Sequence, residues 1–301
     1  MVAAPPLRAD RIPLRLGTMQ PEERLAYESR VRTRQVALAG AAGVLVMLAV
    51  LVQLPGPHVK VNEETLGLIT EHKRMAQDIA GSVISALGSL ALGWTLWWLF
   101  EAARARDPRV RPAFMGPVAF VAGAITAVAA IGTAIASAHA ASEFVSHGNQ
   151  TWVEAHALVS KAWFVIPEVA GYLGAFMVAI SLVLVSLAAM RVGLLPRFMG
   201  YLGIIAGVLT ILPFLPIPIV EAYWLLALAY LMSGRWPSGV PPAWTTGEAV
   251  PWPARQSRDR SQPASRAPRG RTPKPVPQPA GAPAAGSTRA TTPKRKRKRR
   301  K

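Results

Sequence analysis

Three titratable side chains lie in or beside long apolar stretches, where ionisable groups are rare. Glu168 and Glu221 are the two acids between residues 164 and 233, and His139 directly follows the apolar run 114–138. A charge at the centre of a bilayer costs at least ~2.5 kcal/mol, so an acid within an apolar run is a functional hypothesis by default. Carboxylate oxygen and imidazole nitrogen could together bind a cation or a metal, or relay a proton.

Two interpretations of these three residues stay open. In the first, all three lie near the outer ends of membrane helices and converge on one outward-facing pocket. Four further titratable residues would then lie above it: Glu143, His147, Glu154 and His156. In the second, Glu168 and Glu221 each lie in the first turn of a helix, where the helix dipole favours negative charge and interfacial water is within reach. The sequence favours the second interpretation.

The chain lacks the residue patterns of common catalytic and metal sites. It contains no cysteine, which excludes disulfides, iron–sulfur clusters and thiolate metal ligands. No H-E-x-x-H, G-x-S-x-G or P-loop pattern occurs. His147 and His156 are nine positions apart and flank a turn-like Gly148-Asn149 pair, so they do not share a helix face. We therefore expect no enzymatic activity, no cofactor and no metal.

The distribution of apolar residues predicts an all-α integral membrane bundle. A helix needs about 20 apolar residues to cross a bilayer, and lipid forces each crossing backbone to satisfy its own amides as a helix. A polar segment, residues 1–35, precedes a membrane domain at 36–233. We predict about six transmembrane helices, at residues 36–54, 79–100, 114–138, 164–190, 198–212 and 219–233.

Lysine and arginine are unevenly distributed between the two sides of this bundle. Cytoplasmic connections carry the excess of basic residues in membrane proteins. With the N-terminus inside, the cytoplasmic segments hold seven, four and two basic residues plus 17 after the last span, against three, one and none outside. This asymmetry predicts that both termini are cytoplasmic. Residues 198–232 are short for two crossings and a turn, so five spans stay open, although that arrangement would put the Arg-rich tail outside.

Residues 234–301 have the composition of a disordered tail, rich in Pro, Ala, Arg, Ser and Thr. The tail ends in eight consecutive basic residues: Lys294, Arg295, Lys296, Arg297, Lys298, Arg299, Arg300 and Lys301. This run could bind anionic lipid headgroups, could bind nucleic acid through phosphate, or could be a solvated topology determinant. The terminal run has no aromatic residue for base stacking, so nucleic acid is the least favoured partner. No protein partner can be named.

Glycines recur at close spacing within the apolar runs. Gly203 and Gly207 are four positions apart, and Gly171 and Gly174 lie in the preceding apolar run. Small residues at such spacings let helix backbones approach closely in a membrane. We interpret these glycines as packing positions within one bundle rather than as a dimer face.

One inner loop resembles a recurring sequence in another group of membrane proteins. Residues 188–203 read AAMRVGLLPRFMGYLG. This stretch resembles the loop of uncharacterised actinobacterial multi-pass membrane proteins with five or six spans, in which it reads GLLPRWLGWLG or close to it. The resemblance covers only the fourth and fifth spans, and implies topology and lineage but no chemistry. A bacterial cytoplasmic membrane also fits the bias of 26 Arg over 8 Lys, which is typical of GC-rich genomes.

Two functional hypotheses follow from these patterns. The first is a non-enzymatic membrane protein whose bundle anchors a basic cytoplasmic tail on anionic lipid or on a partner. The second is a transporter of a small solute, ion or proton that uses Glu168, Glu221 and His139. The absence of a charged residue deep within any span favours the first hypothesis.

Overall fold

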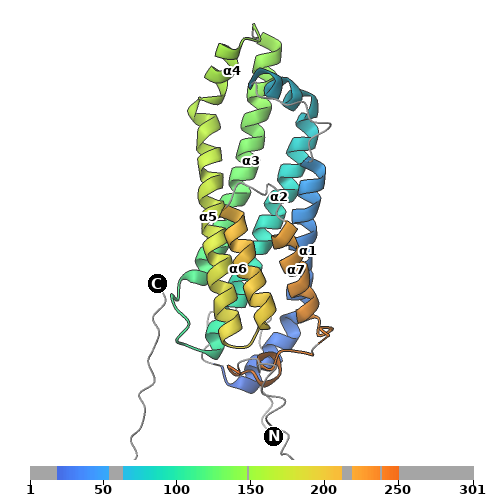
Figure 1. Ribbon diagram of the computed structural model, residues 1–301, viewed down its shortest axis with the longest axis vertical. Helices are drawn as coiled ribbons and strands as arrows, with labels where there is room; N and C mark the ends of the chain where they lie inside the picture. The colour runs from blue at the N-terminus through green and yellow to red at the C-terminus, as the bar shows by residue number, and fades with distance from the viewer. Residues whose placement is uncertain (1–18, 54–63, 148, 212–218, 238, 251–301) are drawn as a thin grey trace, which may run out of the picture. The chain divides into compact units, whose positions relative to one another are not determined.

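The computed structural model describes residues 19–53, 64–147, 149–211, 219–237 and 239–250. All regular secondary structure within these ranges is helical (Figure 1). The helices are α1 (Pro21–Gln53), α2 (Glu64–Arg106), α3 (Met115–His147), α4 (Trp152–Val159), α5 (Ala162–Arg191), α6 (Arg197–Ile211), α7 (Ile219–Met232) and α8 (Ala243–Thr246).

Four of these helices, α1, α2, α3 and α5, are long and apolar enough to cross a membrane. Their outward surfaces carry large apolar side chains: Val128 is 72% exposed, Ile166 is 65% exposed and Ile135 is 60% exposed. Soluble proteins rarely leave contiguous apolar surface of this kind in water, whereas lipid tails solvate it. The chain is therefore a multi-pass helical membrane protein, which confirms the predicted class.

The last two apolar helices are shorter than a crossing requires. α6 has 15 residues and α7 has 14. At a rise of 1.5 Å per residue these lengths are about 22 Å and 21 Å, against a hydrocarbon core of about 30 Å. Six crossings are predicted, and the described residues contain four helices of spanning length. α6 packs against α5, α7 packs against α1, and α6 and α7 also contact each other (Figure 1).

Two helices begin well before the apolar runs that indicate them in the sequence. α1 begins at Pro21, ahead of the run at 36–54, and α2 begins at Glu64, ahead of the run at 79–100. Glu, Gln, Lys, Arg and Ala are strong helix formers, so the backbone stays helical where hydropathy falls. The predicted spans leave residues 55–78 as a connector, and its described part, 64–78, is instead the first part of α2.

The polar ends of α2 and α3 pack with α4 around a small core of their own. α3 continues to His147, beyond the predicted end at residue 138, and α4 starts behind Thr151, whose side chain accepts a hydrogen bond from the backbone N–H of Glu154 at 3.4 Å. Six buried residues form this core: Leu68, Ala140, Ala141, Phe144, Ala155 and Leu158. The polar connection before α5 is thus a folded element.

The main core lies where α1, α2, α3, α5, α6 and α7 meet, and its helices approach closely at glycines. A Cβ atom added at Gly207 would lie 2.7 Å from the carbonyl oxygen of Ala179, and one added at Gly174 would lie 2.9 Å from the backbone nitrogen of Thr126. Both neighbours belong to other helices of the same chain. The prediction that these glycines serve packing within the bundle is confirmed for these two positions.

We expect Gly207→Ala to destabilise the bundle and Gly171→Ala to leave it stable. The new Cβ at 207 would meet a backbone oxygen that cannot rotate away, so α5 and α6 must separate at a cost of ~1–3 kcal/mol. At Gly171 the nearest atom is Ala129 Cβ at 3.7 Å, an ordinary contact, and alanine has the higher helix propensity. Thermal unfolding in detergent, followed by tryptophan fluorescence, compares the variants. Equal melting temperatures would contradict this account of the packing.

Candidate functional site

The three residues predicted as an ion or proton site do not contact one another in the structure. Glu168 is exposed on α5 and accepts a hydrogen bond from Tyr172 Oη at 3.4 Å. Glu221 is buried on α7, and Thr210 Oγ1 donates to its Oε2 at 3.5 Å. His139 lies on α3 with its Nε2 3.7 Å from Glu143 Oε2. Each residue thus has a different local partner, and no recorded interaction joins any two of them.

The predicted first-turn position is confirmed for Glu221, although its side chain is buried, and is wrong for Glu168. Glu221 lies in the first turn of α7. α5 has no acid in its first turn, because this helix begins at Ala162 and Glu168 lies almost two turns further along. Pro167 is therefore inside α5 rather than at its start. A helix dipole acts within its first turn, so it gives Glu168 little support.

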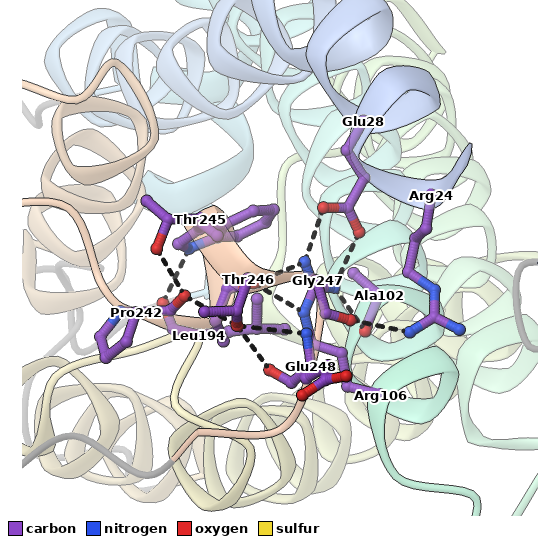
Figure 2. Close-up of polar contacts among 12 residues, drawn as sticks. Arg24, Glu28, Ala102, Arg106, Leu194, Pro242, Thr245, Thr246, Gly247 and Glu248 are labelled. Carbon is purple, nitrogen blue, oxygen red and sulfur yellow. Dashed lines mark hydrogen bonds and ion pairs between the residues drawn. The ribbon is translucent and has the colours of Figure 1, made fainter. Parts of the chain in front are cut away.

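Three of the four buried charged side chains in the described residues gather at the opposite end of the bundle from α4: Arg24, Glu28 and Arg106. Arg106, in the last turn of α2, forms a bidentate ion pair with Glu28 of α1 (Figure 2). Its Nη1 lies 2.7 Å from Glu28 Oε1, and its Nη2 lies 2.6 Å from Oε2. The side chain of Arg106 is 0% exposed and that of Glu28 is 6% exposed. This geometry is the strongest form of the arginine–carboxylate interaction.

All five N–H groups of the Arg106 guanidinium have an acceptor. Besides Glu28, Nη1 donates to the carbonyl oxygen of Ala102 at 2.9 Å, while Nε and Nη2 donate to that of Ala243 at 3.1 and 3.0 Å. A buried charge is tolerated only when it is paired and its remaining protons are bonded. Ala243 belongs to α8, so Arg106 joins α1, α2 and α8. We call the contacts of Arg24, Glu28 and Arg106 with residues 243–247 the clamp.

A second arginine of the clamp holds the residue that follows α8. Arg24 lies one turn before Glu28 on α1, and its Nη1 donates to the carbonyl oxygen of Gly247 at 2.9 Å (Figure 2). Gly247 has φ +70°, and a Cβ there would lie 2.9 Å from the carbonyl oxygen of Pro21. Both the left-handed backbone and the close approach to α1 require glycine at this position.

Trp244 covers the apolar side of the clamp and contacts α2 and the α5–α6 loop. The indole is 7% exposed and stacks on Trp98 of α2, with ring centroids 5.5 Å apart and planes inclined by 13°. The Arg106 guanidinium carbon lies 5.2 Å from the Trp244 ring centroid, within the range of a cation–π contact. The Trp244 Nε1–H donates to the carbonyl oxygen of Leu194 at 3.0 Å, in the loop between α5 and α6.

The first part of the segment predicted as a disordered tail is folded. That prediction places the tail at 234–301, yet Ala243 and Trp244 are buried and residues 239–247 contact α1, α2 and the α5–α6 loop. The averaged Pro/Arg composition hides a local signal, because Trp236 and Trp244 give this short stretch enough apolar surface to dock. The basic run 294–301 lies outside the described residues.

A polar hollow of about 390 Å³ opens in the half of the bundle away from the clamp. It lies among α1, α2, α3 and α5, and includes two carboxylates with several hydroxyls: Glu71, Asp78, Ser82, Ser85, Thr126 and Thr133. The four α2 residues in this set follow one another at spacings of seven, four and three, so they share one helix face. This spacing of polar residues was a sequence signal for the hollow. It indicates a shared helix face only if residues 64–78 are assigned to the same helix as the second span.

No protein-family model, no curated protein and no solved structure matches this chain. Its function must therefore be inferred from the site itself. Within the described ranges, no three His, Asp or Glu side chains come together as a set of metal ligands. In the clamp, Glu28 and Arg106 are paired with each other, and backbone carbonyls accept the remaining Arg106 donors and one hydrogen bond from each Arg24 Nη. These contacts join separate segments, so the clamp is suited to holding segments together. The prediction that the protein is not an enzyme remains a prediction.

We expect Glu28→Ala to destabilise the protein far more than Glu143→Ala. Removing Glu28 leaves the buried Arg106 guanidinium with an uncompensated charge, at a cost of ~3–5 kcal/mol. Glu143 lies 3.4 Å from Lys161 Nζ in an exposed ion pair, whose loss costs at most about 1 kcal/mol. The free energy of unfolding in detergent, measured by denaturant titration, separates the two cases. Similar losses in both variants would mean that the clamp contributes no more than a surface pair.

Proposed function

We propose that the protein is a non-enzymatic membrane anchor that holds its basic C-terminal segment on an anionic membrane surface. The observation that supports this proposal is the clamp, which fixes residues 243–247 to the ends of α1 and α2. Residues 251–301 follow directly, with 16 Lys and Arg and a single acid, Asp259. The bundle thus provides a rigid attachment for a strongly basic chain.

The proposed topology has both termini in the cytoplasm of a bacterium, with α6 and α7 as two short passes that complete six. The clamp supports the same side for both ends, because Arg24 near the start of α1 contacts Gly247 beyond α7. Five passes would put these two residues on opposite faces of the membrane. Short helices can cross where the bilayer thins around them. The basic connections and the resemblance of residues 188–203 to actinobacterial membrane proteins support this orientation and lineage.

Anionic lipid is the partner that fits the terminal run best. Each Lys or Arg near an anionic surface contributes about 1 kcal/mol, and residues 294–301 supply eight such charges in sequence. A segment tethered to the same membrane also meets its headgroups at high effective concentration. Nucleic acid would gain only the nonspecific electrostatic term, and the terminal run contains no aromatic residue on which a base could stack. An acidic protein partner would use the same charges.

A single cysteine at Ser287 can report both the side and the surface contact of the segment, because the chain has no cysteine of its own. We expect Ser287→Cys to react with an impermeant maleimide only after cells are permeabilised. In proteoliposomes, a fluorophore at this cysteine should transfer energy to a lipid-borne acceptor more strongly with phosphatidylglycerol than with phosphatidylcholine alone. Debye screening should reduce this difference at 1 M salt.

The matched control replaces all eight residues of 294–301 with glutamine in the same Ser287→Cys background. This variant should give equal energy transfer in neutral and anionic vesicles. Labelling of intact cells would overturn the orientation. Equal energy transfer in neutral and anionic vesicles for the unmodified tail would overturn the proposed surface contact.

The polar hollow supports a second candidate function, the passage or binding of a small cation or proton. Carboxylates and hydroxyls are the oxygen ligands that hard cations use, and Glu71 and Asp78 lie on one α2 face with Ser82 and Ser85. In this form of the transport hypothesis, the candidate residues are Glu71 and Asp78 of α2 in place of Glu168, Glu221 and His139. The main core at the clamp end fills the other half of the bundle, so a through pathway would require that core to open.

Proteoliposomes loaded with a pH-sensitive dye test this second candidate. If the hollow conducts protons, Asp78→Asn and Glu71→Gln should abolish dissipation of an imposed pH gradient, because each removes a titratable carboxylate from it. Glu168→Gln is the control, since Glu168 is exposed on α5 and does not line the hollow. A chain that dissipates neither a proton nor a sodium gradient faster than empty vesicles would exclude transport of these ions.

A further inference from the structure

A hollow of about 770 Å³ lies on the flank of the bundle, beside the loop that the clamp holds. Its walls come from the segment after α2, the last turns of α5 and the first turn of α6. Three arginines line it: Arg111, Arg191 and Arg197. Leu184, Leu187 and Tyr201 also line it, so basic and apolar surfaces meet in one space. Its volume is within the range of small-molecule sites.

Within the described part of the chain, no acidic partner neutralises the charge of these three arginines. All three are exposed, and among the described residues no carboxylate forms an ion pair with any of them. In the clamp, by contrast, Arg106 is fully occupied. Three guanidinium groups around one hollow favour an anion whose oxygens can accept several N–H donors, which is the recognition chemistry of phosphate.

An apolar surface leads away from the hollow along α5. Leu187, Ile180, Phe176 and Leu173 are 41%, 38%, 50% and 54% exposed. Together with Leu184 they follow at spacings of three and four residues, so they share one face of the helix. The stripe from 187 to 173 is about 21 Å long at 1.5 Å per residue, which is enough to cover the depth of one leaflet, about 15 Å or half of the hydrocarbon core.

The chain's own undescribed segments are poor occupants of this hollow. Residues 251–301 contain a single acid, and residues 1–18 contain three arginines against one aspartate. Both segments are therefore repelled by the three arginines. A soluble anion would satisfy the arginines but would leave the adjoining apolar stripe unused. A phospholipid has both parts in the right order, with its phosphate at the headgroup level and its acyl chains beside α5.

We propose that this hollow is a binding site for one anionic phospholipid of the leaflet on the clamp side. The lipid phosphate lies among Arg111, Arg191 and Arg197, and one acyl chain runs along the apolar face of α5. Basic pockets between membrane helices bind anionic headgroups in this way. The residues of this site belong to the folded bundle and not to the basic tail. Lipid binding here can therefore be tested separately from the proposed anchoring function.

Native mass spectrometry of the full-length chain in detergent, titrated with dioleoylphosphatidylglycerol or dioleoylphosphatidylcholine, tests the proposal. We expect one phosphatidylglycerol to bind about tenfold more tightly than phosphatidylcholine, the affinity ratio of a single strong interaction. The triple variant Arg111→Gln, Arg191→Gln, Arg197→Gln should lose this preference. The single variant Arg191→Gln, at an exposed position, should lose a smaller part of the phosphatidylglycerol preference. It provides the test if the triple variant does not fold.

Two controls separate this site from general charge effects. Arg30→Gln, Arg34→Gln, Arg109→Gln removes three other exposed arginines that do not line the hollow, and it should keep the phosphatidylglycerol preference. The variant with glutamines at 294–301 should keep it too, because the tail is not part of the site. Equal lipid binding by the triple variant and its control would overturn the proposal. Displacement of the lipid by equimolar inorganic phosphate would also overturn it and assign the hollow to a free anion.

Discussion

A guanidinium group can be buried without loss only when each of its five N–H groups has an acceptor. Arg106 meets this condition with Glu28, Ala102 and Ala243, which belong to α1, α2 and α8. None of the three segments can move away without leaving a buried donor or a buried charge unpaired. The geometry of this end of the bundle follows from that requirement, and so does the position of the loop that Trp244 contacts.

Elsewhere the bundle is held by close packing rather than by polar contacts. Membrane helices gain nothing from removing apolar surface from lipid, so their association depends on van der Waals contact. Glycines at the crossings bring α5 against α3 and α6, as at Gly174 and Gly207, while large apolar residues such as Val128 face outward. The protein thus combines a polar lock at one end with small-residue contacts along its length.

The apolar runs predict the four long helices correctly, because a membrane requires each crossing helix to be a long run of apolar residues and hydropathy detects such runs directly. They do not predict the helix ends, since polar helix formers extend α1 and α2 beyond the lipid. They also locate α6 and α7 to within one residue at each end, at lengths of 15 and 14 residues that are below the ~20 residues of an ordinary crossing.

The clamp could not be predicted from local patterns because its partners are distant in the sequence. Arg106 is 78 residues from Glu28 and 137 from Ala243, and Arg24 is 223 from Gly247. Nothing in the spacing of one element specifies these pairs. Glu168 shows the converse: its position in an apolar run raised the hypothesis of a pocket shared with Glu221 and His139, yet its side chain is exposed on α5.

The place of Ala243 in the chain sets the order in which the bundle can be completed. Synthesis proceeds from the N-terminus, so all the apolar helices exist before α8 does. Until then Arg106 Nε and one Nη2 proton lack the carbonyl acceptor that Ala243 supplies. Docking of α8 supplies this last acceptor. A chain interrupted before Ala243 would keep every apolar helix and still present a wet, charged end.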